Sequence, residues 1–307
     1  MELRQLRYVI QIATDKNFSR AAEKLHIAQP SLSQQLSKLE KELGVLLFKR
    51  STNAVELTHA GEVFVEKAQK MLDLSDQLRK EMEDMSQMKR GKLVIGSLPI
   101  TGSHILPLVL PAFKQKYPDI EVVLLEETSA NLEQLASQGK TDLTLLTLPI
   151  QEPSLASEPL IEEEIWLALP ASHPLLDAYE QTKTPVSFAS LRQEPFIALK
   201  KGQGFRQITL DLCAEYGFVP DIVFESSNIE TVQSLVAAGM GIAFVPEMIA
   251  RTRRSHLVPH YVPIEKRPSR TVVVAYRKGR YISRAADAFK QTLMEVMSEH
   301  FNHTSSF

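Results

Sequence analysis

The sequence predicts a multidomain protein: an N-terminal all-α winged helix-turn-helix, a long linker helix, and then a two-lobed α/β domain. Three observations lead to this prediction. Two adjoining helical patterns, at 17–25 and 30–43, are followed by a basic hairpin. Residues 59–88 then lack proline and repeat apolar residues in a four-three rhythm. From residue 93 onward, strand patterns alternate with helical patterns, which is typical of α/β domains.

The second helical pattern has one apolar face and one polar face. Its leucines at 32, 36, 39 and 43 are spaced by four, three and four residues, so they lie on one side of a helix. Pro30 suits the first helical turn, and Gly44 suits a left-handed helix end. The opposite face has side chains of the kinds that contact base edges and phosphates in a DNA major groove: Ser31, Ser33, Gln34, Ser37, Lys38 and Lys41.

Flanking elements complete a DNA-binding pattern. Apolar spacing predicts helices over 3–13 and 17–25, and residues 46–50 and 55–58 are expected to form the two strands of a wing. An amphipathic three-helix domain that binds a protein partner would show the same polar face. The ordered combination of helices, turn and wing favours double-stranded DNA as the partner. Residues 1–58 hold nine Lys or Arg against six Asp or Glu, so we expect one such domain to bind DNA weakly.

The helix predicted over 59–88 has an apolar stripe. Its members follow a heptad spacing, with Ser75 filling one gap: Phe64, Ala68, Met71, Leu78, Met82 and Met85. The winged domain is too small to cover this stripe, so a second copy of the chain is the simplest cover. The alternative is that the helix lies on the α/β domain of its own chain. Dimerisation would place two recognition helices about 34 Å apart, the spacing of successive major grooves.

Composition narrows the class of protein. The chain has 307 residues, 44% of them hydrophobic, and a formal net charge of −2, which suits two or three globular domains and excludes a polycation. No apolar run is long enough to span a membrane, and the first residues lack the hydrophobic segment of a signal peptide, so we expect a cytoplasmic protein. The single cysteine, Cys213, excludes a disulfide within one chain, and its simplest interpretation is a small buried group.

The α/β part is expected to form two small lobes around a cleft. Strands are predicted at 93–97, 120–126, 142–148, 165–169, 196–199, 221–224, 242–245 and 271–276. Helices are predicted at 104–117, 131–138, 205–216, 228–238 and 281–297. Open α/β sheets bind ligands beyond the carboxyl ends of their strands, near helix N-termini.

Four junctions between these elements are rich in hydroxyls and glycines, and together they predict a polar crevice that suits an anion. They contribute Ile100, Thr101, Ser103, Thr128, Ser129, Gly202, Gln203, Phe205 and Ser227 as candidate ligand-binding residues. Each hydroxyl can instead be an ordinary helix cap, and Ser227 with Glu230 is predicted to form a capping box. Both roles can coexist where a capped helix points into a cleft.

An enzyme is the competing class, and the motifs give it little support. The segment 202–204 lacks the third glycine of a dinucleotide-binding loop, and the glycines of 239–241 precede a strand instead of a helix. His256 and His260 are four residues apart, but Pro259 argues against a helix that would make them metal ligands. A periplasmic solute-binding protein would explain the lobes but not the winged head. We therefore predict a protein that is not an enzyme and has no metal or cofactor.

The chain resembles the LysR-type transcriptional regulators along essentially its whole length. The N-terminal resemblance rests on Met1-Glu2-Leu3-Arg4-Gln5-Leu6-Arg7-Tyr8, Phe18-Ser19-Arg20-Ala21-Ala22, Gln29-Pro30-Ser31-Leu32-Ser33-Gln34-Gln35, Leu39-Glu40-Lys41-Glu42-Leu43-Gly44 and Leu57-Thr58-His59-Ala60-Gly61. Later landmarks include Ile105-Leu106-Pro107, Gly139-Lys140-Thr141-Asp142, Ser172-His173-Pro174-Leu175 and Val236-Ala237-Ala238-Gly239-Met240-Gly241.

This resemblance implies a homodimer or homotetramer, assembled through the 59–88 helix and the effector domains. It also implies an effector domain similar to periplasmic binding proteins, with a small-molecule coinducer between its lobes, and contact with RNA polymerase if the protein is an activator. The expected domains are 1–58 for DNA binding, 59–92 for the linker and hinge, and 93–307 for the effector. Lobe I would comprise 93–163 and 268–300, and lobe II 164–267.

Carried over position by position, the resemblance implies DNA contacts by Gln29, Pro30, Ser33, Gln34 and Lys38, with Arg50, Thr52 and Asn53 near the backbone or minor groove. Many relatives have a basic residue where Gln34 and Asn53 stand, so we expect fewer charged contacts. The residues that match the effector pocket are Thr101, Ser129, Thr147, Gln203, Phe205 and Ser227. Relatives that bind aromatic carboxylates can have arginine at the position of Thr147, and its absence argues against that carboxylate clamp. Activation and repression are not separable by sequence.

Overall fold

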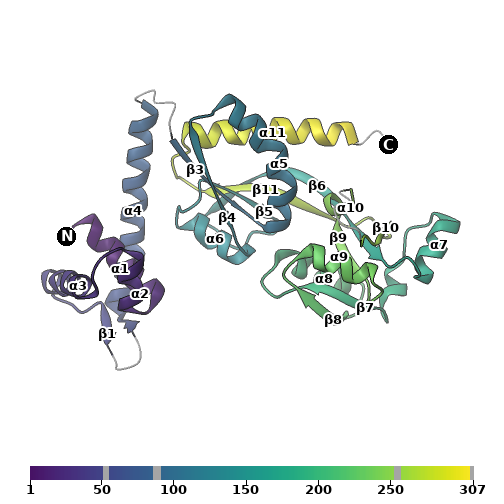
Figure 1. Ribbon diagram of the computed structural model, residues 1–307, viewed down its shortest axis with the longest axis horizontal. Helices are drawn as coiled ribbons and strands as arrows, with labels where there is room; N and C mark the ends of the chain where they lie inside the picture. Colours follow the sequence, from purple (N-terminus) through teal and green to yellow (C-terminus); the bar gives the residue numbers. More distant parts are fainter. Residues whose placement is uncertain (51–54, 86–90, 252–256, 305–307) are drawn as a thin grey trace. The chain divides into compact units, whose positions relative to one another are not determined.

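The computed structural model describes residues 1–50, 55–85, 91–251 and 257–304, so Thr52, Asn53 and His256 lie outside the described residues. Figure 1 labels most of the helices and strands. The chain divides into two compact units, 1–88 and 89–307, which are considered one at a time below.

The N-terminal unit is a winged helix-turn-helix followed by a long helix, which confirms the predicted fold class. Leu32, Leu36 and Leu39 are buried, as the spacing predicted, whereas Leu43 is 38% exposed and lies outside the core. Gly44, with a φ of +71°, ends the helix in the left-handed conformation. The elements are α1 (Leu3–Asp15), α2 (Phe18–Lys24), α3 (Gln29–Leu43), β1 (Phe48–Arg50), β2 (Val55–Leu57) and α4 (His59–Met85).

One small core holds the three N-terminal helices and the wing together. Ala21 and Ala22 of α2 are buried in this core, and their small side chains allow α2 to approach α1 and α3 closely. Asn17 begins α2 by accepting a hydrogen bond from the Arg20 N–H, 3.0 Å away. The wing strands β1 and β2 pair in antiparallel register, with Phe48 opposite Leu57.

The predicted apolar stripe of the long helix α4 is covered only at its first two positions. Ala68 is buried, and Phe64 packs against the core of the winged head. The expectation that this unit cannot cover the stripe is therefore wrong for the first two positions. Farther along, large apolar side chains are exposed: Met71, Leu74, Leu78, Met82 and Met85.

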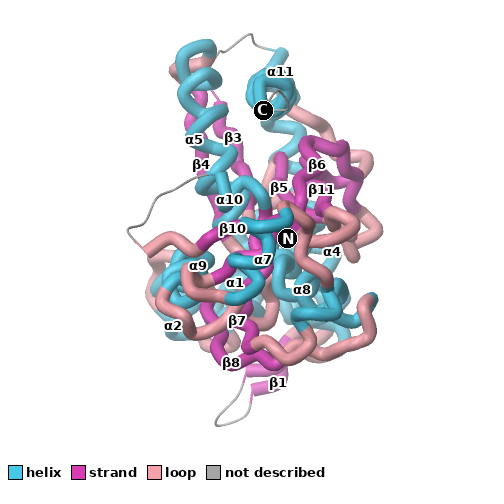
Figure 2. The backbone as a smooth tube through the Cα atoms, turned by 90° about the vertical axis from the view of Figure 1, so that its right-hand side faces the viewer, coloured by secondary structure: helices cyan, strands magenta, loops and turns pink. Residues whose placement is uncertain are grey.

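Lobe I of the second unit is a sheet covered on both faces. Neighbouring residues alternate between the faces, as strand geometry requires: Leu145 packs with α5 and α11, whereas Leu146 packs with α6. Figure 2 shows α5 running alongside β3 and β4. The elements are β3 (Gly91–Ser97), α5 (Pro99–Lys116), β4 (Ile120–Glu126), α6 (Ser129–Ser137), β5 (Leu143–Thr147), the first part of β6 (Leu155–Leu169), β11 (Ser269–Arg277) and α11 (Arg284–Thr304).

Lobe II is built on the second part of β6. The short parallel pair β7 and β8 joins it through a bridge between Phe196 and Ile242. Phe188, Phe196 and Phe244 are buried here, and the ring of Phe244 contacts Phe188 in a tilted arrangement and Phe196 edge to face. The elements are α7 (Pro174–Thr182), a 3₁₀ turn (Phe188–Leu191), β7 (Pro195–Leu199), α8 (Gly204–Glu215), β8 (Asp221–Ser226), α9 (Ile229–Ala237), β9 (Ala243–Pro246), α10 (Glu247–Arg251) and β10 (His260–Pro263).

Strand β6 belongs to both lobes. Residues 155–164 pair with β11, and residues 165–169 pair with β9 and β10. The sheet order is therefore β10-β6-β11-β5-β3-β4, with β9 also paired to β6. The chain passes from lobe I to lobe II along β6 and returns just before β11, so these two adjacent strands form the connection between the lobes.

Several predicted elements differ from those observed. Helix α5 begins at Pro99 rather than at 104, because proline fits the first turn, where its missing N–H costs nothing. The strand predicted at 165–169 is the end of a fifteen-residue strand. Helix α7 and strand β10 were not predicted. The capping box at Ser227 is wrong, since Asn228 is the N-cap of α9 and accepts a hydrogen bond from the Glu230 N–H.

Candidate nucleic-acid interface and interlobe cleft

The polar face of α3 is exposed over a buried leucine face. Gln29, Pro30, Ser31, Gln34 and Lys38 are exposed, and Ser33 is half-buried. Gln29 Nε2 donates a hydrogen bond to Ser33 Oγ, 3.1 Å away, across one helical turn. Because one helix carries all six side chains, they can enter a single groove together.

An inward-facing acid keeps negative charge away from this surface. Glu40 is 8% exposed, and its Oε1 accepts hydrogen bonds from the N–H groups of Leu47, at 2.7 Å, and Phe48, at 3.3 Å. The carboxylate therefore links α3 to the wing. Lys38 and Lys41 remain exposed beside it, as a phosphate-binding surface requires.

The wing is described only in its strands. Arg50 ends β1, but its side chain lies outside the described residues, as do Thr52 and Asn53. The implied wing contacts of these three residues stay predictions.

Three helices of the second unit begin without a side-chain cap at the junctions where the effector was expected. The N-cap residues of α5, α6 and α8 are Leu98, Thr128 and Gln203, and none of their side chains caps its helix. The first backbone N–H groups of these helices are consequently not taken by an N-cap side chain. Such N–H groups, with the helix dipole, favour a bound anion.

Two predicted effector residues have buried hydroxyls. Thr101, in the first turn of α5, is fully buried, and Thr147 is the last residue of β5. Within the described part of the chain, neither Oγ1 atom has a hydrogen-bond partner. A buried hydroxyl without a partner costs free energy, so both atoms are suited to hydrogen-bond a ligand or a water.

The lobes contact each other through two glycines that precede or begin α8. A Cβ placed on Gly202 would lie 3.8 Å from Thr128 Cγ2, and one placed on Gly204 would lie 2.6 Å from Ser129 Oγ. The predicted residues Thr128, Ser129, Gly202 and Gln203 are therefore brought together across the lobes. Gly202 also has a φ of +92°, a left-handed conformation that favours glycine.

A buried ion pair lies next to this junction, and it was not predicted. Arg270 donates to Glu163 Oε1 from Nε, at 2.8 Å, and from a terminal guanidinium nitrogen, at 2.5 Å. Its guanidinium carbon also lies 5.2 Å from the ring centre of Phe205, a predicted effector residue. Nothing in the sequence distinguished Glu163 from the flanking acids, the exposed Glu162 and the half-buried Glu164.

Three predicted effector residues are placed differently from the others. Ser103 is exposed and lines a groove between α5 and β4 on the outer side of lobe I. Ser227 is exposed in the loop before α9, and Ile100 belongs to the hydrophobic core. Ile100 positions the first turn of α5 rather than offering a polar contact.

Family models match nearly the whole chain. The model described as bacterial regulatory helix-turn-helix protein, lysR family, matches residues 3–62, and the LysR substrate binding domain matches residues 86–298. The chain belongs to the LysR family of transcriptional regulators. As a LysR family protein, it is a DNA-binding transcriptional regulator with an effector-binding domain.

Individual LysR family relatives align from end to end. The HTH-type transcriptional regulator YcgK of Bacillus subtilis is 40% identical over 315 residues, covering 98% of this chain and 97% of YcgK. A hydrogen peroxide-inducible genes activator of Escherichia coli O6:H1 is 31% identical, with 98% of each chain covered. The solved structure of a full-length OxyR variant from Pseudomonas aeruginosa is 30% identical with a TM-score of 0.71, covering 97% of this chain and 94% of that one.

Proposed function

We propose that α3 contacts base edges and phosphates in the major groove of an operator. The proposed contacts are Gln29, Pro30, Ser31, Ser33, Gln34 and Lys38, with Arg50, Thr52 and Asn53 near the DNA backbone or minor groove. The observation that carries the proposal is the exposed polar face of α3 over the buried Leu32, Leu36 and Leu39. Amides and hydroxyls on such a face can hydrogen-bond base edges, and lysine neutralises phosphate.

A salt-titrated binding assay tests this proposal. The DNA flanking the protein's own coding region is compared with random DNA of equal length. Gln34→Ala is expected to reduce discrimination between the two by roughly 1–3 kcal/mol, and Lys38→Ala to weaken binding to both alike. Gln134→Ala, on the exposed face of α6, is the matched control and should change neither. Equal losses on both DNAs for Gln34→Ala would contradict a base contact.

The effector site lies between the lobes in this proposal, and it takes a small molecule with an anionic or strongly polar group. The uncapped N-termini of α5, α6 and α8 supply backbone donors, and Thr101 and Thr147 supply hydroxyls. Threonine at 147 cannot form the bidentate fork of an arginine, so recognition depends on single hydrogen bonds and on shape.

Thermal unfolding in the presence of small carboxylates and phosphates tests the effector site. A ligand at one hundred times its dissociation constant stabilises the folded state by about 2.7 kcal/mol. Thr147→Val should abolish the stabilisation that such a ligand gives to the wild type. Thr182→Val, at an exposed helix end, is the control and should keep it. Unchanged stabilisation in Thr147→Val would place the ligand elsewhere.

Peroxide is the effector suggested by the names of some relatives, but the thiol of this chain gives it little support. Cys213 is the single cysteine of the sequence and is fully buried in lobe II. Burial raises the pKa of the Cys213 thiol to about 12. The thiolate is the reactive form, so this sulfur is poorly suited to react with peroxide. We therefore favour reversible ligand binding over thiol oxidation.

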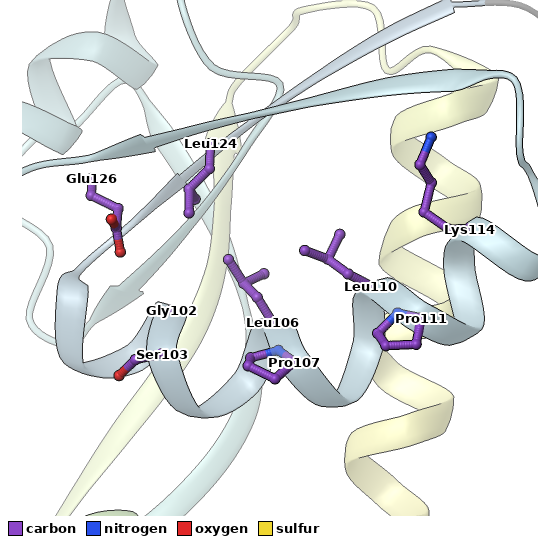
Figure 3. Close-up of a pocket in the computed structure, with 9 residues that line it drawn as sticks. All are labelled: Gly102, Ser103, Leu106, Pro107, Leu110, Pro111, Lys114, Leu124 and Glu126. Carbon is purple, nitrogen blue, oxygen red and sulfur yellow. The ribbon is translucent and has the colours of Figure 1, made fainter.

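The working protein is a homodimer or homotetramer in this proposal, assembled through α4 and the effector domains. The exposed stripe from Met71 to Met85 supports the first contact. An outer groove of lobe I supports the second: it measures about 440 Å³ and lies between α5 and β4. Figure 3 shows Leu106, Leu110 and Leu124 in this groove, with charged side chains at its two ends. Light scattering at several concentrations measures the assembly.

Exposed apolar residues on the edge strand β8 and just before it offer a complementary surface on another copy. Val219, Val223 and Phe224 are 85%, 47% and 41% exposed in lobe II. Patches of this kind on two copies suit a repeated, self-complementary contact. Loss of assembly in Leu124→Asp would support this contact if a variant with a substitution at an exposed polar residue still assembles.

The remaining assignments follow from a DNA-binding role. We place the protein in the cytoplasm with the DNA; within the described residues, none of the helices meets the length and hydropathy needed to span a membrane. RNA polymerase is the further partner if the protein activates transcription. We assign 1–58 to DNA binding, 59–92 to the linker and 93–307 to the effector domain, with lobe I at 93–163 and 268–300 and lobe II at 164–267.

A further inference from the structure

The first turn of α8 is the point where lobe II meets lobe I. A Cβ on Gly204 would lie 2.6 Å from Ser129 Oγ, although ordinary contacts begin at 3.4 Å. Gly204 does not have a positive φ, so its backbone would accept any L-amino acid. Glycine at 204 therefore provides space between the lobes and not a special backbone conformation, and a side chain there would have to displace the Ser129 hydroxyl. Gly202 differs, because its positive φ requires glycine while its Cβ position is uncrowded.

The next residue fixes this turn to the connection between the lobes. Phe205 is 5% exposed, and its ring lies against the Arg270 guanidinium. Arg270 is on β11, and its ion-pair partner Glu163 stands directly opposite on β6. These two strands carry the chain between the lobes, so Phe205 contacts the hinge itself.

The ion pair has little freedom to move. The side chains of Arg270 and Glu163 are 3% and 0% exposed. The second carboxylate oxygen of Glu163 accepts a hydrogen bond from the Met248 N–H at the start of α10, 3.0 Å away. Any displacement of the guanidinium would leave a buried charge with weaker compensation, which is costly. A residue packed on this pair is therefore held in a defined position.

We propose that the first turn of α8 sets how far the lobes close, because Gly204 allows them to touch while Phe205 holds the turn against the hinge pair Glu163–Arg270. Closure around an effector would then stop where Gly204 meets Ser129. A larger side chain at 204 would hold the lobes apart whatever occupies the cleft. The inference rests on the proposed effector cleft, but its test needs no effector, so either idea can fail alone.

The experiment measures the distance between the lobes in the full-length protein. Spin labels are attached at Gln134→Cys on α6 and Glu215→Cys on α8 in a Cys213→Ala background. Excess unlabelled protein suppresses distances between copies. Double electron–electron resonance then gives the distance distribution, and circular dichroism gives the midpoint of thermal unfolding for each variant.

Gly204→Leu should lengthen the mean distance, and Gly204→Ala should lengthen it less, since rotation of the Ser129 hydroxyl can relieve the smaller clash. Adding Ser129→Gly to Gly204→Leu should shorten the distance again. Gln207→Leu, an exposed position one turn along α8, is the control and should leave the distance unchanged. An unchanged distance in a folded Gly204→Leu protein would overturn the proposal, as would failure of Ser129→Gly to shorten it.

A matched pair of variants tests the hinge. Glu163→Gln weakens the ion pair against Phe205, and Asp142→Asn weakens a comparable buried pair with Arg280 inside lobe I. Both carboxylates also accept a backbone N–H, so both variants should lower the unfolding midpoint. Only Glu163→Gln should broaden the interlobe distance distribution. If both variants broaden it equally, or neither does, the hinge pair does not fix the α8 turn.

Discussion

Helix α3 carries its proposed DNA contacts on one continuous element, whereas the proposed interlobe site draws on six separate segments of the chain. The α3 face rests on a core formed within the N-terminal unit. The cleft depends on α5, α6, β5, the first turn of α8 and the strands that join the lobes. A rigid helix can present fixed contacts to DNA, and a site assembled from two lobes can change when the lobes move.

This difference predicts how each site fails. Loss of the local core should destroy the α3 surface while the cleft survives. Loss of a hinge contact should alter the cleft while α3 still binds DNA. The two kinds of failure can be separated because the single tryptophan, Trp166, belongs to lobe II and reports only on the second unit.

The largest expected effect comes from truncating a buried leucine in the core beneath α3. Leu36 is 1% exposed, and Leu36→Ala should lower the free energy of unfolding of the winged unit by about 2–5 kcal/mol, from lost burial and the cavity left behind. Specific DNA binding should fall with it. Calorimetry and circular dichroism should show an earlier transition, while the Trp166 fluorescence transition stays in place.

Leu43→Ala is the control on the same helix. Leu43 is 38% exposed, so its truncation should cost much less than that of Leu36. Leu36→Ala could shift the unfolding transition seen by Trp166 fluorescence by as much as the transition seen by circular dichroism. In that case the two units are not stabilised separately, and the proposed contrast between the sites is wrong.

The link between α3 and the wing should give a smaller effect. Glu40→Ala removes the acceptor of the Leu47 and Phe48 N–H groups, leaving buried donors without a partner, which costs roughly 1–3 kcal/mol. Hydrogen exchange of these two amides should quicken. Glu40→Gln keeps one amide oxygen and should be milder. Glu42→Ala, exposed on the same helix, should leave both amides protected.

The same contrast explains how much the sequence could predict. The helices and wing of the N-terminal unit are encoded by local signals, such as leucine spacing, Pro30 and Gly44, so their prediction was confirmed. Leu43 shows the limit of this approach, because periodicity assigns a face but not the extent of the core. For Ser227, a side chain one residue away, Asn228, caps the helix instead.

The cleft was predictable only in part, because its contacts join residues distant in sequence. Hydroxyls and glycines at strand–helix junctions indicated Thr128, Ser129 and Gly202, and the structure brings these together. Glu163 and Arg270 are 107 residues apart, and only strand pairing makes them neighbours. The role of Gly204 depends on Ser129 across the cleft, so no local signal distinguished it from an ordinary loop glycine.

The smallest expected effect concerns the hydrogen bonds of Glu158 within lobe I, and it depends on pH. Hydrogen bonds from Lys290, on α11, and Tyr276, on β11, lower the pKa of Glu158 below its ordinary value of 4.5. A lowered carboxyl pKa stabilises the folded state above that ordinary value, and the stabilisation is lost as pH falls through the lowered pKa. Because the carboxylate is partly exposed, Glu158→Gln should cost less than about 1 kcal/mol at pH 7.

The measurement is urea unfolding of wild type and Glu158→Gln between pH 3 and pH 7, followed by Trp166 fluorescence. The two proteins should converge in stability toward acid, because the wild-type carboxyl becomes neutral there as well. Glu295→Gln, which removes a more exposed carboxylate paired with Lys116, should show no measurable pH-dependent difference. A constant gap between wild type and Glu158→Gln at every pH would mean that Glu158 acts by packing and neutral hydrogen bonding. The charge of Glu158 would then contribute nothing to the stability of lobe I.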